Sequence, residues 1–125
     1  MTLDWNSGSL AEGLRCYREA RFFDAHEHWE SVWLTLDGQE KRFLQALIQI
    51  AAAFHHLQRG NRAGTASLLR RAHIRLSHCP AVFGGIEVAP LREEVSAWIP
   101  GIENGSLADD AACPRICPVV VRLGT

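Results

Sequence analysis

Three residues on one face of an expected helix have types and spacing suited to chemistry: His26, Glu30 and Trp33. Residues three and four apart are neighbours on a helix surface, so the His26 imidazole should lie beside the Glu30 carboxylate, with Trp29 and Trp33 flanking the pair. A His and a carboxylate at this spacing can present two ligands to one metal ion. The same geometry lets the carboxylate select one histidine tautomer for acid–base work.

A second polar stripe lies in the next apolar segment. At about 100° per residue, Gln45, Gln49 and His56 project from nearly the same side of that helix, whereas His55 points elsewhere. If the two stripes face each other, His26, Glu30, Gln49 and His56 form one polar pocket lined by Trp29, Trp33 and Gln45. We therefore predict His26, Glu30 and His56 as ligands of a divalent metal such as zinc, with His26 and Glu30 as catalytic candidates.

One alternative stays open for these residues. The glutamines and His56 can form the solvent side of their helix, with His26 and Glu30 an ordinary hydrogen-bonded pair. The run from His26 to Glu30 also falls short of the zinc-protease pattern H-E-x-x-H, because position 30 is Glu, and we do not interpret it as a protease. Glu27 is expected to act as the capping partner of Asp24.

Apolar periodicity and capping residues predict an all-α fold, a compact array of about five helices with an irregular C-terminal tail. A central helix is expected between residues 38 and 60, because residues 43–54 are apolar nearly all round. We predict one helical domain over residues 1–108, a loop at 80–85, and a tail over 109–125 that is packed or partly disordered. The expected helices are 10–20 (capped by Ser9, with Glu12 as its capping-box partner), 25–36 (capped by Asp24), 38–60, 62–77 (capped by Asn61) and 90–100, the last ended by Pro100 and Gly101.

Composition excludes several functional classes. A net charge of −1 provides no field to attract nucleic acid, and the cluster Arg59, Arg62, Arg70, Arg71 and Arg75 is predicted to be a solvated face. No run of apolar residues is long enough to cross a membrane, and the first residues lack a signal-peptide pattern, so we expect a cytoplasmic protein. The four cysteines are expected to be free thiols, and Cys113 and Cys117 do not have the C-x-x-C spacing.

The motifs resemble those of a known family. The segments RFFDAHEHWESVW (21–33), FLQALIQIAAAFHH (43–56) and GNRAG (60–64) resemble the bacterial and archaeal family called domain of unknown function 309, over about residues 10–77. Its H-x-x-x-E-x-x-W/Y hallmark is matched by His26, Glu30 and Trp33, and its second motif by Gln49 and His56. The resemblance implies a small helical array with a metal site, and its members are often labelled metal-dependent hydrolases. An aromatic or aliphatic residue is more usual at position 55, so the choice between His55 and His56 stays open.

Three functions are compatible with these residues. The first is a metal-dependent hydrolase in which water occupies an open metal position. The second is a non-enzymatic binding module that recognises a small polar ligand or docks a partner protein. The third is a buried His–Glu–Gln–Trp network that only fixes helix packing. The substrate, the metal and the oligomeric state are not determined by the sequence.

Overall fold

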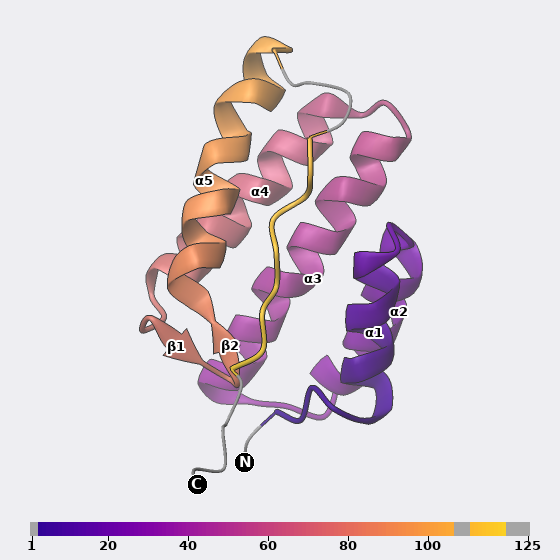
Figure 1. The fold of residues 1–125 in the computed structure, drawn as a ribbon, viewed down its shortest axis with the longest axis vertical. Coiled ribbons are helices and arrows are strands. Elements are labelled where there is room, and N and C mark those ends of the chain that lie inside the picture. Colours follow the sequence, from indigo (N-terminus) through magenta and orange to yellow (C-terminus); the bar gives the residue numbers. More distant parts are fainter. Residues whose placement is uncertain (1–2, 107–110, 120–125) are drawn as a thin grey trace, which may run out of the picture.

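The computed structural model describes residues 3–106 and 111–119 and shows an all-α fold with one small β-hairpin. Helix α3 lies between α2 and α4 and packs against both. Helix α1 packs against α2 and α5 against α4, and in the view of Figure 1 α1 and α5 lie in front of these partners. The elements, in chain order, are α1 (Gly8–Arg18), α2 (Phe22–Trp33), α3 (Gly38–Gln58), α4 (Arg62–Ser77), β1 (Val82–Phe83), β2 (Ile86–Glu87) and α5 (Val88–Asn104).

Helix α3 is the centre of the core, as its all-round apolar sequence predicts. Phe43, Leu47 and Ile50 are fully buried on it, and Ala51 and Ala53 are buried beside them. Alanines at these positions let the neighbouring helices approach closely, since they add no bulk beyond Cβ. The packing of α3 against both α2 and α4 makes it the element that positions residues from the two halves of the chain relative to each other.

The predicted capping box of the first helix is wrong. Helix α1 begins at Gly8, with Ser7 as its N-cap residue, and Ser9 lies inside the first turn. The Ser7 hydroxyl donates to Asp4 at 2.7 Å instead of accepting from a helix amide. Glu12, the expected partner of Ser9, forms an ion pair with Arg15 at 2.6 Å. The Glu12 carboxylate thus binds Arg15 one turn further along the helix, where a capping box would have it accept from the backbone N–H at the helix start.

Helix α2 also begins earlier than predicted. It starts at Phe22 with Arg21 as N-cap residue, so Asp24 lies in its first turn and is not the cap. The Arg21 guanidinium binds Oδ2 of Asp24 at 2.9 Å, so this carboxylate pairs with Arg21 where a helix cap was expected. The helix ends at Trp33, three residues before the predicted end at Leu36, and turn residues follow at 34 and 35.

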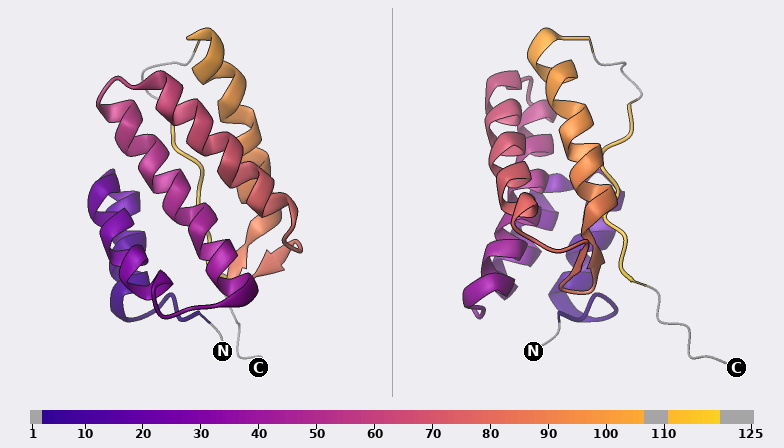
Figure 2. Two further views of the ribbon diagram at one scale, coloured as in Figure 1. Left: turned by 180° about the vertical axis from the view of Figure 1, so that it is seen from behind. Right: turned by 90° about the vertical axis from the view of Figure 1, so that its left-hand side faces the viewer.

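The start of helix α4 agrees with the sequence prediction. The Asn61 side chain accepts a hydrogen bond from the backbone N–H of Gly64 at 2.9 Å, as an N-cap asparagine should. The helix ends at Ser77, also as predicted. The α3–α4 connection is therefore short, and the two helices run side by side across the back of the molecule (Figure 2).

Helix α5 is longer than the sequence suggested. It continues through Pro100 to Asn104 and ends with Gly105 in the left-handed conformation, at φ 72°. Arg62 of α4 donates to the Ile102 carbonyl at 2.6 Å, which satisfies an acceptor in the last turn. A tertiary contact thus supports the turn beyond Pro100. None of the helices in the described part of the chain is both long and apolar enough to cross a membrane.

The segment predicted as a loop at 80–85 contains a strand. Val82 and Phe83 of β1 pair antiparallel with Glu87 and Ile86 of β2, around Gly84 and Gly85, both with positive φ. A hairpin this short does not stand alone. It is supported by the buried Ile86, which also forms a bridge to Pro118 of the C-terminal segment.

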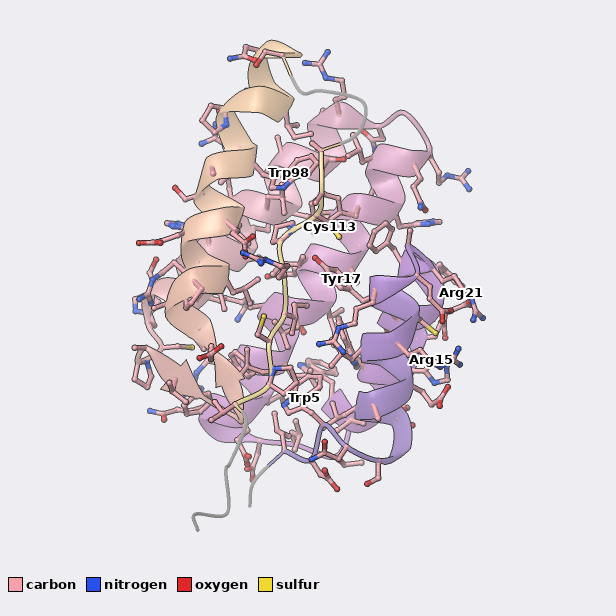
Figure 3. All side chains as sticks on the ribbon, in the orientation of Figure 1. Trp5, Arg15, Tyr17, Arg21, Trp98 and Cys113 are labelled. Carbon is pink, nitrogen blue, oxygen red and sulfur yellow. The ribbon has the colours of Figure 1, made fainter. Side chains whose placement is uncertain are left out.

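Part of the C-terminal segment packs against the helices. Residues 111–119 run in extended form across α3, between α1 and α5 (Figures 1 and 3). The buried Tyr17 hydroxyl donates to the Pro114 carbonyl at 2.7 Å, and burial raises the pKa of Tyr17 well above its usual value. Ile116 is buried as well. Residues 107–110 and 120–125, which include the rest of the predicted tail, lie outside the described residues.

Candidate functional site

The structure brings the predicted His26–Glu30 pair together on α2. Nε2 of His26 lies 3.2 Å from Oε2 of Glu30, and the two side chains are 28% and 48% exposed. Nδ1 of His26 is buried and has no hydrogen-bond partner among the described residues. If the His26 imidazole is neutral and donates from Nε2 to Glu30, its lone pair is on the buried Nδ1. His26 then offers a proton acceptor on its buried side, and Glu30 offers a carboxylate on the more exposed side.

Of the two adjacent histidines, His55 is the one placed toward α2. The Phe23 ring, 51% exposed, lies between His26 and His55, with ring centroids 6.1 and 5.4 Å away respectively. His56, our predicted third ligand, has Nδ1 at 3.2 Å from the Asn61 amide nitrogen, at the turn into α4. The rotation of α3 about its axis, which periodicity alone does not determine, decides this placement.

The predicted ligands fit a catalytic metal centre only in part. Such a centre normally has three protein ligands, and no group of three His, Cys, Asp or Glu side chains is positioned to hold an ion within residues 3–106 and 111–119. His26 and Glu30 supply two donors at one point. We derive no reaction step through a metal from this geometry.

The two tryptophans of α2 have different environments. Trp29 is fully buried in the core, and its indole N–H donates to the Leu10 carbonyl of α1 at 3.2 Å. It therefore faces α1 and does not line a pocket with His26. Trp33 is half-buried under the Lys41 ammonium, 4.2 Å from the ring centroid, in a cation–π arrangement. Its indole N–H is buried without an acceptor among the described residues.

A cavity of about 450 Å³ opens between the first half of α3, the second half of α4 and the hairpin. This volume lies in the usual range of small-molecule sites. Gln49, predicted as pocket-lining, lies in its wall and is only 7% exposed. Oε1 of Gln49 is fully buried and has no hydrogen-bond donor among the described residues. The rest of the wall is partly apolar and partly cationic.

Three arginines contribute the charge of this wall: Arg42 on α3, and Arg71 and Arg75 one turn apart on α4. No aspartate or glutamate lies among the lining residues. Most described arginines bind a carboxylate or a backbone carbonyl; those that bind neither within the described residues are Arg42, Arg59, Arg71 and Arg75.

A smaller hollow of about 200 Å³ adjoins this cavity and shares Arg42 and Arg75 with it. Its wall includes Trp33, Gln45 and Lys41. Three of the predicted pocket residues, Trp33, Gln45 and Gln49, are thus distributed over two adjoining hollows. His26, Glu30 and His56 are not in the walls of either one.

The cavity also contains a thiol. Burial raises the pKa of Cys79, and its S–H donates to the Arg75 carbonyl at 3.6 Å. Both effects favour the neutral thiol over the thiolate, which is the nucleophilic form. Cys79 is therefore suited to lining the cavity and not to attacking a substrate. All four cysteines are free, as predicted.

Sequence reasoning missed the cavity arginines, because it treated one cluster as a uniform solvated face. The structure separates its members: Arg62 binds the last turn of α5, Arg70 pairs with Glu103 of α5, and Arg71 and Arg75 line the cavity. Arg71 and Arg75 are four residues apart and so share a helix face, which was the available signal. Their different surroundings depend on α5, which sequence spacing does not place.

The fold and the site together define a class: a small helical protein, with five helices in its described part, a surface His–Glu pair and a cationic cavity between α3 and α4. Residues 10–68 match the family described as Domain of unknown function (DUF309). The match confirms the resemblance over these residues. The matched segment contains Arg42 and Gln49, whereas Arg71 and Arg75 lie beyond it.

A relative of this chain is an uncharacterized protein of Aquifex aeolicus (strain VF5). The two are 31% identical over 84 residues, which is 66% of this chain and 25% of the relative. The chain therefore spans about a quarter of the relative's length.

Proposed function

We propose that this protein is a binding module that holds a small molecule in the cavity between α3 and α4. The observation that carries the proposal is the Gln49 amide, which is 7% exposed, lines the cavity and leaves Oε1 without a donor in the described chain. A buried amide without partners costs free energy, and a ligand with a hydroxyl or N–H group at this point would recover it.

The walls of the cavity support the same function. Small-molecule sites are mainly apolar with a few polar groups that orient the ligand. Here Phe43 and Phe83 form an edge-to-face pair with centroids 5.4 Å apart, and Ile74 and Pro80 extend the apolar surface. The polar groups are Gln49 and the three arginines. This is the second of the functions compatible with the sequence, with Gln45, Gln49 and Trp33 retained near the ligand and the His–Glu pair outside it.

The test is a fragment screen by NMR, in which ¹⁵N-labelled protein is titrated with neutral and charged small aromatic and aliphatic compounds. We expect some compounds to shift backbone amides around Gln49 and Arg75. Ile74→Trp should abolish these shifts by filling the cavity without disturbing the core, because Ile74 is 59% exposed. Leu34→Trp is the matched control, since Leu34 is 67% exposed and lies outside the cavity wall. Shifts that persist in Ile74→Trp would contradict the proposal.

A second candidate is metal-dependent hydrolysis at His26 and Glu30, the two predicted ligands that lie in contact; the predicted third ligand, His56, lies beside Asn61. The observation that favours it is the 3.2 Å His26–Glu30 contact together with the unpartnered Nδ1 of His26. A divalent ion such as zinc would lower the pKa of a bound water. Metal analysis of tag-free protein, wild type and His26→Ala, tests this candidate. About one equivalent that is lost in the variant supports it; no metal in either, after incubation with zinc, manganese and iron, rejects it.

A further inference from the structure

We infer that the ligand of this cavity is an amphipathic organic anion: a phosphate monoester or carboxylate head on an apolar body. The inference rests on the binding function proposed above and adds the chemical class of the ligand. It depends on three separate features of the wall, namely its unpaired guanidinium groups, its apolar side and the Gln49 amide between them.

The guanidinium groups define the head. Arg42, Arg71 and Arg75 bring three formal positive charges to one concave surface that has no acidic lining residue. Arginine binds carboxylate and phosphate through parallel charge-assisted hydrogen bonds, and such bonds are about twice as strong as neutral ones. Lys41 in the adjoining hollow adds a fourth positive charge on the side shared with Arg42 and Arg75. A concave wall of one sign focuses the field and concentrates anions.

Several arginines outside the cavity pair with carboxylates, whereas those in the cavity wall have no such partner among the described residues. Arg70 lies next to Arg71 in the sequence but pairs with Glu103, and Arg115 pairs with Glu94 at 3.3 Å. Glu103 and Glu94, both on α5, thus provide carboxylates for two arginines that lie outside the cavity. At the cavity no carboxylate of the described chain is placed to neutralise the guanidiniums. An anionic ligand would supply that missing partner.

The apolar side of the wall defines the body. Phe43 is nearly fully buried, Phe83 is half-buried, and Ile74 is exposed at the rim. A free inorganic anion would fill little of a cavity of about 450 Å³ and would leave the exposed parts of Phe83 and Ile74 in contact with water. An acyl chain or aromatic ring attached to the head would bury them, at about 25 cal/mol for each Å² removed from water.

The Gln49 amide indicates that the body of the ligand also carries a polar group. It comes from the inner side of α3, about two turns after Arg42, and its Oε1 lacks a donor among the described residues. Its NH₂ group can donate to the head of the ligand, while Oε1 requires a hydroxyl or N–H. The preferred ligand is therefore a hydroxylated or amide-bearing anion, and a plain alkyl chain should bind less tightly.

The test compares anionic probes with neutral partners that have the same apolar body. Hexyl phosphate and heptanoate, which both have a hexyl body, are paired with hexanol and heptanamide respectively, each titrated into the full chain by NMR and calorimetry. We expect each anion to bind at least about tenfold more tightly than its neutral partner, with an affinity that falls as salt rises. The better of the two anions identifies whether phosphate or carboxylate is the preferred head.

Two arginine variants separate a specific contact from net charge. Arg75→Gln should reduce the advantage of the anion to about threefold or less if one charge-assisted contact is lost. Arg59→Gln removes the same charge from a residue that also lacks a described partner but lies outside the cavity wall, and should change little. Equal losses in both variants would overturn the inference.

The outcomes also distinguish the inference from the proposed function. If neutral and anionic probes bind equally and Ile74→Trp abolishes both, the binding function stands and the anionic class is overturned. If no probe shifts the amides of the cavity wall, both are overturned.

Discussion

Replacing Gln49 by leucine should stabilise the ligand-free protein. Most buried polar residues stabilise a fold through their hydrogen bonds, so their removal is destabilising. Gln49 is different, because its side chain is 7% exposed and its Oε1 has no donor among the described residues. Leucine has a similar volume and carries no polar atom, so Gln49→Leu should remove a desolvation cost without breaking a described hydrogen bond.

The size of the effect follows from that unsatisfied oxygen. A buried polar group left without a partner costs about 1–3 kcal/mol. Part of this is recovered wherever water reaches the rest of the amide through the cavity, so we expect a gain of about 1–2 kcal/mol in the free energy of unfolding. For a chain of 125 residues this corresponds to a rise in Tm of roughly 3–8 °C.

Urea unfolding followed by circular dichroism measures this change. The midpoint should rise with the m-value unchanged, since the surface exposed on unfolding is nearly the same. Gln45→Leu is the matched control one turn earlier on α3; Gln45 is half-buried, without a fully buried orphan atom, and should give a smaller change. A Gln49→Leu protein that is less stable than wild type would refute the reasoning, because the amide would then be satisfied in the free protein.

Three further substitutions test the supports of the fold. Gly13→Ala should destabilise by about 2 kcal/mol despite the better helix propensity of alanine, because its Cβ would lie 2.3 Å from Nε1 of Trp29; an unchanged urea midpoint would contradict this. Tyr17→Phe should cost about 1–2 kcal/mol by leaving the Pro114 carbonyl without its donor, and trypsin should then cleave the C-terminal segment faster than in wild type. Asn61→Ala should lower stability by about 1 kcal/mol through loss of the α4 cap, measured by thermal unfolding, whereas Asn61→Gly should lose only a few tenths.

The histidines show which contacts can be predicted from residue spacing within one helix and which cannot. His26 and Glu30 are four residues apart on α2, so their contact is a local consequence of helix geometry and was predicted. The choice between His55 and His56 depends on how α3 is rotated against α2. The structure places His55 next to the exposed Phe23 and His56 next to Asn61. The metal-ligand set remains a prediction, with two of its donors in contact.

What the sequence determined by itself is the local order of the chain. Apolar periodicity located the helices, the all-round apolar run identified α3 as central, and the side chain of Asn61 marked the start of α4. These features follow from interactions within a few residues of each other, which the chain carries into any tertiary arrangement. The same local rules also misplaced the first two helix starts, where ion pairs took the carboxylates expected to act as caps.

Only the tertiary structure decided which residues share a surface. Pro100 stays within α5 with Arg62 bound to the following turn, and Ile86 orders a hairpin in an expected loop because Pro118 lies beside it. The cavity likewise combines Arg42 and Gln49 of α3 with Arg75 of α4. The physical reason is that helix rotation and offset are set by the packing of the entire core, so residues far apart in the chain meet only once that packing is complete.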